Sequence, residues 1–249
     1  MNAAWLRPDW PAPARVRALA TTRAGGVSVG AYAGLNLGLH VGDVAASVAA
    51  NRAILAAQLP AEVLWLNQVH GSQVVVAEAQ PQPPGAAVDG DASIARSGAR
   101  VLAIQHADCL PLLLCDRAGS VVGAAHAGWR GLALGVIEQT VAAMDVAPGE
   151  LCAWLGVAIG ASAYEVGGEV RAAFVSRDAQ AARAFAALGG DHWRCDLYAL
   201  ARQRLVGVGI SVERICGGGL CSFSDSAGFY SHRRDGVTGR MATLVWLAA

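Results

Sequence analysis

The sequence predicts an α/β or α+β fold in which mixed sheets form a sandwich that helices cover. Short apolar runs typical of buried strands alternate with helical segments, but without the regular βαβ order of a purely parallel sheet. Adjacent apolar runs also indicate hairpins. A chain of 249 residues that is 54% hydrophobic can bury a large core, in one domain or in two.

The expected elements follow from apolar periodicity and from capping and turn residues. Strands are expected at residues 16–20, 64–68, 73–77, 151–159 and 241–247. Helices are expected at residues 44–58, with Asp43 as the N-cap, and at 131–144, 165–174, 178–188 and 196–206. Residues 21–43 are rich in glycine and should form loops and turns. The Pro/Gly/Asp-rich segment 79–93 could be a domain linker, but we expect a loop at the mouth of a site.

Residues 101–130 are predicted to be the centre of the active site. They are expected to form two apolar strands joined by a short turn, with Cys109 at the start of the first strand and His126 at the end of the second. If residues 116–119 form the turn, Cys109 opposes His126. Opposed β-carbons on antiparallel strands lie about 4.5–5.5 Å apart, so the two side chains could share a metal ion or form a thiol–imidazole pair.

Composition excludes several classes of protein. The formal net charge is zero, which argues against a nucleic-acid partner and an anionic membrane surface. All 19 basic residues are arginine, so chemistry that needs a lysine Schiff base or a P-loop lysine is impossible. Six cysteines without a CxxC pair fit neither a zinc ribbon nor a disulfide-rich secreted domain. With no signal peptide and no long apolar run, we expect a soluble, cytoplasmic protein.

Residues 26–30, GVSVG, match the GxSxG nucleophile elbow of hydrolases. That elbow needs a preceding strand in an assembled sheet and an oxyanion loop upstream, and only 25 residues precede it here. We therefore interpret this segment as a glycine turn.

Three histidines lie beside small residues at expected strand ends and, together with Cys109, are candidate metal ligands: His70, His106 and His126. A lone histidine is more often a surface or core residue than a ligand. Two histidines and one cysteine nevertheless suit Zn²⁺ with a fourth position open for water or substrate. They also match a blue-copper site, but six histidines without a His-x-His pair cannot supply a multicopper cluster. With His106 as a fourth ligand, the zinc would be structural, as in a binding module.

Arginines near these residues could bind an anionic group. Arg130 directly precedes an expected helix, whose N-terminal amides attract anions. Arg233, Arg234 and Arg240 bring three guanidinium groups within eight residues, although any single arginine is more often solvated. Trp129 could stack on a planar base, or pack in the core.

Five motifs, in this order and spacing, resemble those of the YfiH/YlmD family, which is related to the human laccase domain-containing protein. They are TTRAGGVSVGAYAGLNLG from residue 21, NQVHG from 67, HADCLPLLL from 106, HAGWRG from 126 and FYSHRRDGVTGRMA from 229. The resemblance spans nearly the whole chain. It implies one catalytic domain over residues 1–249, an α/β/β/α sandwich, and a zinc site in a cleft with His70, Cys109 and His126 as ligands.

The resemblance also implies an activity. The family is described as carrying out phosphorolysis of adenosine, inosine and 5′-methylthioadenosine, with adenosine deaminase activity. Older descriptions call its members polyphenol oxidases, or laccases, with copper, and some bacterial members are linked to removing misincorporated amino acids from peptidoglycan precursors. This chain departs from the pattern at residues 161–165, ASAYE, where relatives carry a cysteine pair, and at His232, where an aromatic residue is usual.

Roles for further residues follow from this chemistry. Zinc could activate water for attack on C6 of adenine, whereas phosphorolysis needs a pocket for the phosphate anion. The candidate substrate-binding residues are Asn36, Arg52, Arg130 and Arg233. Asp108 could orient the neighbouring ligand or act as an acid or base, and a hydrogen bond in the turn is equally compatible with its position.

A metal-free alternative uses the same two central side chains. Cys109 would be the nucleophile and His126 the base of a thiol hydrolase, for instance an amidase acting on cell-wall precursors. The expected partners are a purine nucleoside and phosphate, with no nucleic acid and no membrane, and the chain is expected to be a monomer or a homodimer.

Overall fold

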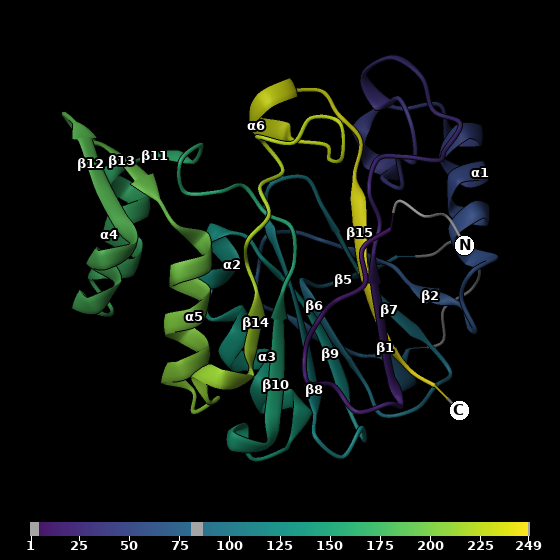
Figure 1. Ribbon diagram of the computed structural model, residues 1–249, viewed down its shortest axis with the longest axis horizontal. Coiled ribbons are helices and arrows are strands. Elements are labelled where there is room, and N and C mark those ends of the chain that lie inside the picture. The colour runs from purple at the N-terminus through teal and green to yellow at the C-terminus, as the bar shows by residue number, and fades with distance from the viewer. Residues whose placement is uncertain (1–4, 81–86, 249) are drawn as a thin grey trace.

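Two β-sheets packed face to face, with helices on both outer faces, form the body of the computed structural model (Figure 1), which describes residues 5–80 and 87–248. The four-stranded sheet has the order β1 (Val16–Ala20), β15 (Met241–Leu247), β7 (Val101–His106) and β2 (Val63–Leu64). The six-stranded sheet has the order β14 (Ile215–Gly217), β10 (Leu151–Leu155), β8 (Leu110–Asp116), β9 (Val122–Ala127), β6 (Ala92–Ala95) and β4 (Val74–Val76). Both sheets mix parallel and antiparallel pairs, which confirms the predicted fold class.

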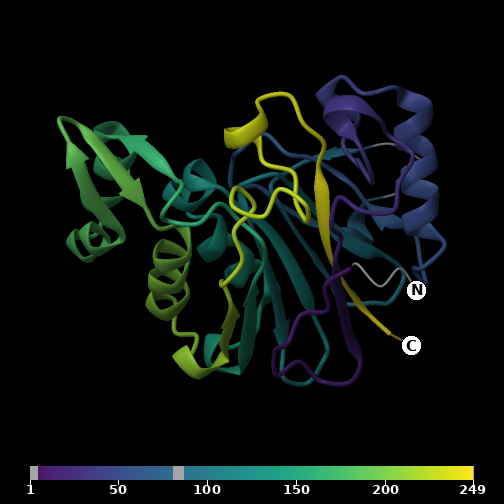
Figure 2. The ribbon, with the colours of Figure 1, turned by 45° about the horizontal axis from the view of Figure 1, so that its top comes forward.

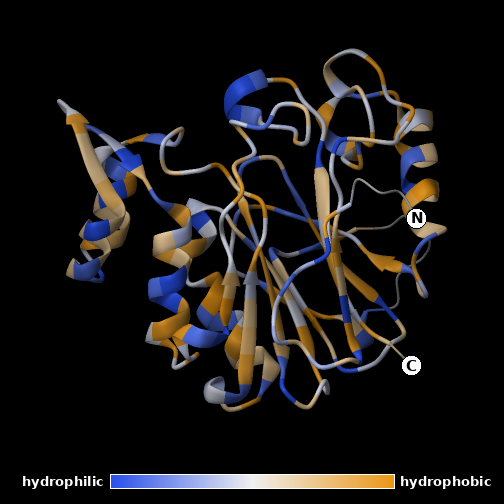
Figure 3. Ribbon diagram, in the orientation of Figure 1, coloured by the Kyte–Doolittle hydropathy of each residue, from blue (hydrophilic) through white to orange (hydrophobic). Residues whose placement is uncertain are grey.

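Alternation along the central strands sorts their side chains between three apolar clusters. On β8, Leu113 faces the other sheet, whereas Leu112 faces the helices. On β7, Leu102 faces the six-stranded sheet and Ala103 faces the opposite layer. Both strands are thus buried on both faces, which explains why they read as continuous apolar runs. Figure 3 shows these strands as the hydrophobic centre of the molecule.

Helices complete the outer layers. The six-stranded sheet is covered by α2 (Trp129–Leu134), α3 (Val136–Met144) and α5 (Leu197–Gly207), and the four-stranded sheet by α1 (Ala45–Ala56). In the described part of the chain, no helix combines the length and the apolar character that crossing a membrane requires.

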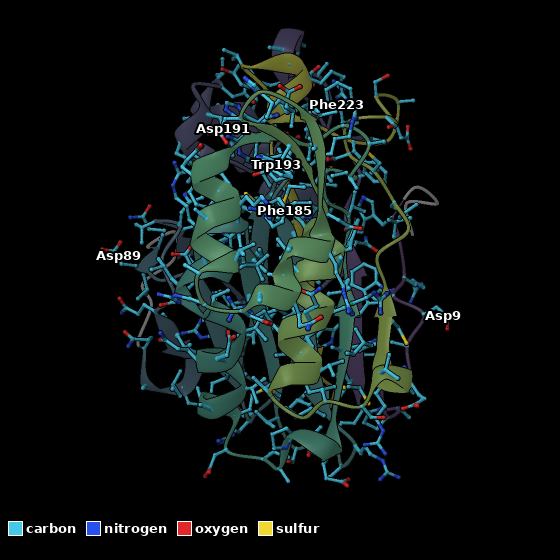
Figure 4. All side chains as sticks on the ribbon, turned by 90° about the vertical axis from the view of Figure 1, so that its left-hand side faces the viewer. Asp9, Asp89, Phe185, Asp191, Trp193 and Phe223 are labelled. Atoms are coloured by element: carbon cyan, nitrogen blue, oxygen red, sulfur yellow. The ribbon has the colours of Figure 1, made fainter. Side chains whose placement is uncertain are left out.

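A small three-stranded sheet projects beside α5, at the side of the molecule opposite α1 (Figures 1 and 2). It consists of β11 (Glu165–Gly167), β13 (His192–Cys195) and β12 (Phe185–Gly189), with α4 (Gly168–Val175) packed on it. Both Phe185 and Trp193, labelled in Figure 4, contact α4: the Phe185 ring lies with its centroid 6.1 Å from that of Phe174, and Arg171 lies over the Trp193 ring. A two-stranded parallel pair is formed by β3 (Leu66–Asn67) and β5 (Val88–Asp89).

The strands at 16–20 and 241–247 are confirmed, but the helix expected at 178–188 is wrong. The Asp178 carboxylate does accept a hydrogen bond from the Gln180 amide, yet only a 3-10 helix, Ala179–Ala184, follows before β12 begins. Pairing with β13 overrides the helix propensity of the alanine-rich segment. The helix expected at 165–174 likewise starts late, because β11 occupies its first residues.

Several other boundaries differ from expectation. Segment 79–93 contains β5 and the start of β6, so it is not simply a loop; its residues 81–86 lie outside the described residues. The helix expected at 131–144 is two helices that meet at Gly135, whose φ of 91° is left-handed. The strand expected at 151–159 ends at Leu155. Asp43 is not the N-cap of α1; that position is Val44.

The central hairpin forms, but its register differs by two residues from the prediction. Residues 101–106 form a separate strand, β7, in the other sheet, and the hairpin consists of β8 and β9. His126 opposes Pro111 and not Cys109, which precedes β8. The cause is the turn, because the Asp116 carboxylate accepts hydrogen bonds from Ser120 and from the Val121 amide. These bonds hold a four-residue loop where a two-residue loop was assumed.

The glycine-rich loop before α1 is fastened by one buried side chain, Asn51. Its amide accepts from the Val27 N–H at 2.8 Å and donates to Ser28 Oγ at 2.8 Å and to the Asn36 carbonyl at 2.9 Å. Ser28 is itself buried and donates to Asp43. The GVSVG segment is therefore a structural turn, as predicted, and Ser28 is no exposed nucleophile.

We expect Asn51→Ala to lower the free energy of unfolding by about 2–4 kcal/mol, because buried backbone groups of the loop lose their partners. Chemical denaturation measures this. The matched control is Asn67→Ala, which removes an exposed side chain bonded to Asp89 and should change stability by less than about 0.5 kcal/mol. Equal losses in the two variants would contradict the role assigned to Asn51.

Candidate metal centre

The candidate site lies where the ends of strands from both sheets come together. In the six-stranded sheet, β9 ends one residue after His126, β8 begins directly after Cys109, and β6 begins directly after Asp91. In the four-stranded sheet, β7 ends at His106, which pairs with Met241 at the start of β15. Sheet pairing thereby gathers chemically active residues from distant parts of the chain.

Three side chains from separate segments could hold one metal ion: His70, Cys109 and His126, whose ligand atoms all lie within 4.8 Å of one another. The two imidazole rings meet edge to face, with centroids 4.9 Å apart. His126 is buried, Cys109 is partly exposed and His70 is exposed, so the group is open to solvent on one side. Among the described residues His106 is not part of this group, since its Nε2 lies 2.9 Å from Thr243 Oγ1. Three ligands with an open side resemble a catalytic rather than a closed structural site.

A buried carboxylate, Asp91, positions both histidines. It accepts hydrogen bonds from three successive amides, those of Val69, His70 and Gly71, at 3.2, 3.0 and 2.6 Å. The same carboxylate lies 2.9 Å from Nδ1 of His126. Burial alone would raise the pKa of Asp91, but the hydrogen bond and charge of His126, with the amides of Gly71 and His70, lower it. An ionised Asp91 keeps the proton of His126 on Nδ1 and leaves Nε2 free to bind a metal.

The thiol and the buried imidazole of the site polarise each other. Burial alone would raise the pKa of Cys109, yet the charges and hydrogen bonds of His126 and His70 lower it to about 6. Burial would lower the pKa of His126, but the Cys109 thiolate and Asp91 raise it. Without a metal, both shifts favour the thiolate form of Cys109 and the imidazolium form of His126. A thiolate is also the form of cysteine that binds metals.

A cavity of about 190 Å³ opens beside the three ligands. Its lining is rich in histidine and amide side chains and contains no carboxylate; the residues are His40, Gln68, His70, Gln105, His106, Ala107, Cys109, His126, His232 and Arg240. Burial, followed by the charges of His126 and Arg240, lowers the pKa of His106 to about 3, so this histidine is neutral. Of the charged lining groups, the thiolate of Cys109 offsets the imidazolium of His126, which leaves the guanidinium group of Arg240.

A second, more open hollow of about 460 Å³ has a different character. Aromatic, cationic and acidic side chains share its lining, including Trp129, Arg130, Tyr164, Glu165, Glu169 and Arg233. Arg130 lies over the Trp129 ring and Arg233 over the Tyr164 ring. Burial, and then the charges of Cys195 and Cys109, raises the pKa of Tyr164, so this tyrosine is close enough to feel the charge of Cys109.

The remaining predicted site residues lie outside the lining of the metal pocket. Asn36 is fully buried, and its side chain bonds Asp43, Gly38 and the Arg240 amide. Arg52 lies over the Trp65 ring, 4.0 Å from its centroid, and donates to the Leu37 carbonyl. Both side chains bond residues of the segment 37–43, which contributes His40 to the lining of the pocket.

Asp108, which directly precedes the metal ligand Cys109, forms hydrogen bonds with two distant segments of the chain. Its carboxylate accepts from Ser222 Oγ and from the Arg233 amide, both at 2.6 Å. The second bond holds the start of α6 (His232–Asp235), the short helix at the top of the view in Figure 1. Asp108 itself has a left-handed φ of 96°, so the turn before β8 is fixed by these contacts.

Asp91 was not among the site residues predicted from the sequence. It falls in the Pro/Gly/Asp-rich segment 79–93, where a loop was expected. Asp89 and Asp91 flank a single glycine, and no local signal separates the exposed Asp89 from the buried Asp91. Only the pairing of β6 with β9 brings Asp91 against His126.

We expect Asp91→Asn to weaken zinc binding about 10- to 100-fold, because an amide cannot accept from all of these donors and no longer fixes His126. Titration against a chromophoric zinc chelator measures the affinity. Asp89→Asn is the control: Asp89 lies at the outer surface (Figure 4), where it bonds Asn67, and its loss should leave zinc affinity unchanged. Equal affinity in wild type and Asp91→Asn would show that Asp91 does not position the ligands.

In the metal-free protein, alkylation of Cys109 by iodoacetamide should reach half its maximal rate near pH 6, well below the value of about 8.5 for an ordinary thiol. Only the thiolate reacts, so the rate falls as pH drops below the pKa. Peptide mass spectrometry follows the modification. His126→Ala removes the strongest influence that lowers this pKa and should move the midpoint upward; a wild-type midpoint near 8.5 would refute the thiolate–imidazolium pair.

Comparison with known proteins places the chain in a family. Residues 17–248 match the family model described as multi-copper polyphenol oxidoreductase laccase. The chain is 52% identical to a purine nucleoside phosphorylase of Pseudomonas aeruginosa over 99% of both chains, and 49% identical to the purine nucleoside phosphorylase YfiH of Escherichia coli over 96% of this chain and 97% of the relative.

Solved structures agree with these sequence matches. A Neisseria meningitidis protein superposes with a TM-score of 0.94 at 50% identity, covering 99% of this chain and 100% of the other. YlmD from Geobacillus stearothermophilus superposes with a TM-score of 0.91 at 30% identity, covering 100% and 98%. The chain therefore belongs to the YfiH/YlmD family.

Proposed function

We propose that this protein is a metal-dependent purine nucleoside phosphorylase. It would convert adenosine, inosine and 5′-methylthioadenosine, with phosphate, into the free base and ribose 1-phosphate or methylthioribose 1-phosphate. The observation that carries the proposal is the group of His70, Cys109 and His126, open on one side and set in a pocket without carboxylates. The names of the relatives at 49–52% identity support the same activity.

Zinc is the metal that we propose for this group. Two imidazoles and one thiolate are a ligand set that zinc favours when a fourth position stays open. Bound zinc would act as a Lewis acid that polarises a water molecule or a phosphate oxygen. The copper in the family model's name is compatible with the same ligands, because copper binds such sites more tightly than zinc.

The side chains around the proposed metal would position the phosphate and the nucleoside for the reaction. Phosphorolysis forms a bond from a phosphate oxygen to C1′ of the ribose while the bond from C1′ to N9 of the base breaks, and the leaving base takes up a proton. The second hollow would hold the nucleoside. Trp129 and Tyr164 offer ring surface to the base, Glu165 and Glu169 could accept hydrogen bonds from ribose hydroxyls, and Arg130 borders both.

Asp91 and Asp108 act indirectly in this scheme. Asp91 orients His126. Asp108 accepts a hydrogen bond from the Arg233 amide, and this bond ties α6 to the residue that directly precedes the ligand Cys109. We assign positioning roles to both carboxylates, since their oxygens already accept hydrogen bonds from the protein.

Two further activities are proposed for the same residues. A metal that polarises water would also support hydrolytic deamination of adenosine at C6. The thiolate–imidazolium pair of Cys109 and His126 favours, as the alternative function, a thiol amidase acting on peptidoglycan precursors. Copper-dependent oxidation of polyphenols would be incidental, because three ligands cannot hold a multicopper cluster.

We also propose that residues 1–249 form one catalytic domain working in the cytoplasm. All six cysteines lie among the described residues and are unpaired, which supports a reducing compartment. A nucleoside and phosphate would be its partners, without nucleic acid or membrane, and the unit would be a monomer or homodimer.

Incubation of zinc-loaded protein with adenosine, inosine or 5′-methylthioadenosine tests the proposal. We expect free adenine or hypoxanthine only when phosphate is present, together with the sugar 1-phosphate, as measured by chromatography. Cys109→Ala should lose both zinc and turnover, whereas Cys216→Ala, which removes a thiol distant from the ligands, should keep both. Base release without phosphate would point to a hydrolase, and amide hydrolysis by metal-free protein would favour the thiol amidase.

A further inference from the structure

We propose that Arg240 is the phosphate-binding residue of the metal pocket, and that inorganic phosphate binds between its guanidinium group and the side chains of His40 and His232. This inference rests on the proposed phosphorylase function and specifies where its second substrate lies. Among the arginines that the sequence indicated for an anion, it selects Arg240 in place of Arg52, Arg130 and Arg233.

The surrounding loop holds Arg240 in place. Its amide donates to Asn36 Oδ1 at 2.8 Å, and its Nη1 donates to the carbonyls of Thr238 and Gly239, both at 3.0 Å. Its aliphatic stem lies so close to Gly38 that a β-carbon there would meet Arg240 Cγ at 2.8 Å. Asn36, proposed from the sequence to contact substrate, therefore acts by positioning Arg240.

Arg240 lacks a counter-charge in direct contact. In the described part of the chain, no carboxylate forms an ion pair with it, and its Nε and Nη2 have no hydrogen-bond partner. Burial lowers the pKa of Arg240, whereas the charges of Cys109 and Asp108 raise it, and the guanidinium group remains a cation at neutral pH. Arg240 is half-buried, so its two unpaired guanidinium nitrogens could donate hydrogen bonds to an anion that enters the pocket.

The neighbouring side chains reinforce the preference for an anion. His40 and His232 line the same cavity, as do the proposed metal ligands, and the lining contains no carboxylate. Burial, and then the charges of Arg240 and Arg52, lower the pKa of His40, so Arg240 lies close enough to His40 to influence its charge. The Nδ1 of His232 lies 2.6 Å from the Gly236 carbonyl, so its ring is oriented.

The other arginines are less suited to hold phosphate. Arg130 and Arg233 share their hollow with Glu165 and Glu169, whose charges oppose a bound anion. Arg233 also donates to the Glu165 carbonyl. Arg52 is committed to the Trp65 ring and the Leu37 carbonyl. Of these residues, only Arg240 lines the cavity that contains the metal ligands, and its free guanidinium edge matches two oxygens of a phosphate.

Isothermal titration with inorganic phosphate, on metal-free and zinc-loaded protein, tests this assignment. Arg240→Gln should weaken phosphate binding about 10- to 100-fold in both forms, since one or two charge-assisted hydrogen bonds are lost. Arg240→Lys keeps the charge and should bind with intermediate affinity. Arg130→Gln should raise the KM for the nucleoside and leave phosphate affinity unchanged, and Arg117→Gln, at an exposed ion pair with Glu150, should change neither.

Zinc content and thermal melting establish that each variant is folded and loaded; if Arg240→Gln does not fold, Arg240→Lys carries the comparison. Unchanged phosphate affinity in Arg240→Gln, or wild-type affinity in a folded Arg240→Lys, would overturn the assignment. So would acetate binding more tightly than phosphate. Phosphorolysis that persists with an unaltered phosphate KM refutes the Arg240 site alone. Phosphate binding through Arg240 without any base release refutes the phosphorylase function and leaves the site standing.

Discussion

The candidate site depends on one buried carboxylate, that of Asp91. Three successive amides from the loop around His70 converge on it, and so does the ring of His126. His70 has a left-handed φ of 60°, a conformation that costs energy for a residue with a side chain, and the hydrogen bonds to Asp91 offset that cost. Two ligands from distant segments are therefore held in place by the fold itself, and metal binding does not have to order them.

The surroundings of Cys109 fall into two regions whose lining side chains differ in charge. On one side, the metal pocket contains histidines and Arg240 without any carboxylate. In the second hollow, arginines and glutamates balance each other around Trp129 and Tyr164. The first region offers the unpaired guanidinium edge of Arg240, and the second combines aromatic rings with side chains of both charges. This separation suits a reaction between phosphate and a nucleoside, and it gives no support to a multicopper oxidase.

The hairpin shows how far sequence reasoning could go. The apolar runs correctly indicated buried strands, and ligand chemistry singled out Cys109 and His126. Their exact opposition was wrong, because the side chain of Asp116 stabilises a longer turn that no periodicity reveals. The two residues still meet, since Cys109 lies just before its strand and the turn at Asp108 directs it back toward His126. Residue type was predictable, whereas the path that joins the residues was not.

The sequence by itself determined the layered α/β architecture, the family and the set of possible metal ligands, because apolar periodicity and ligand chemistry are properties of the residues themselves. Tertiary structure decided which polar residues serve the site. Asp89 and Asp91 are indistinguishable in sequence, yet strand pairing buries only Asp91 against His126. Burial, counter-charges and the lining of a cavity depend on segments far apart in the chain, so they single out Arg240 among many arginines only once the chain is folded.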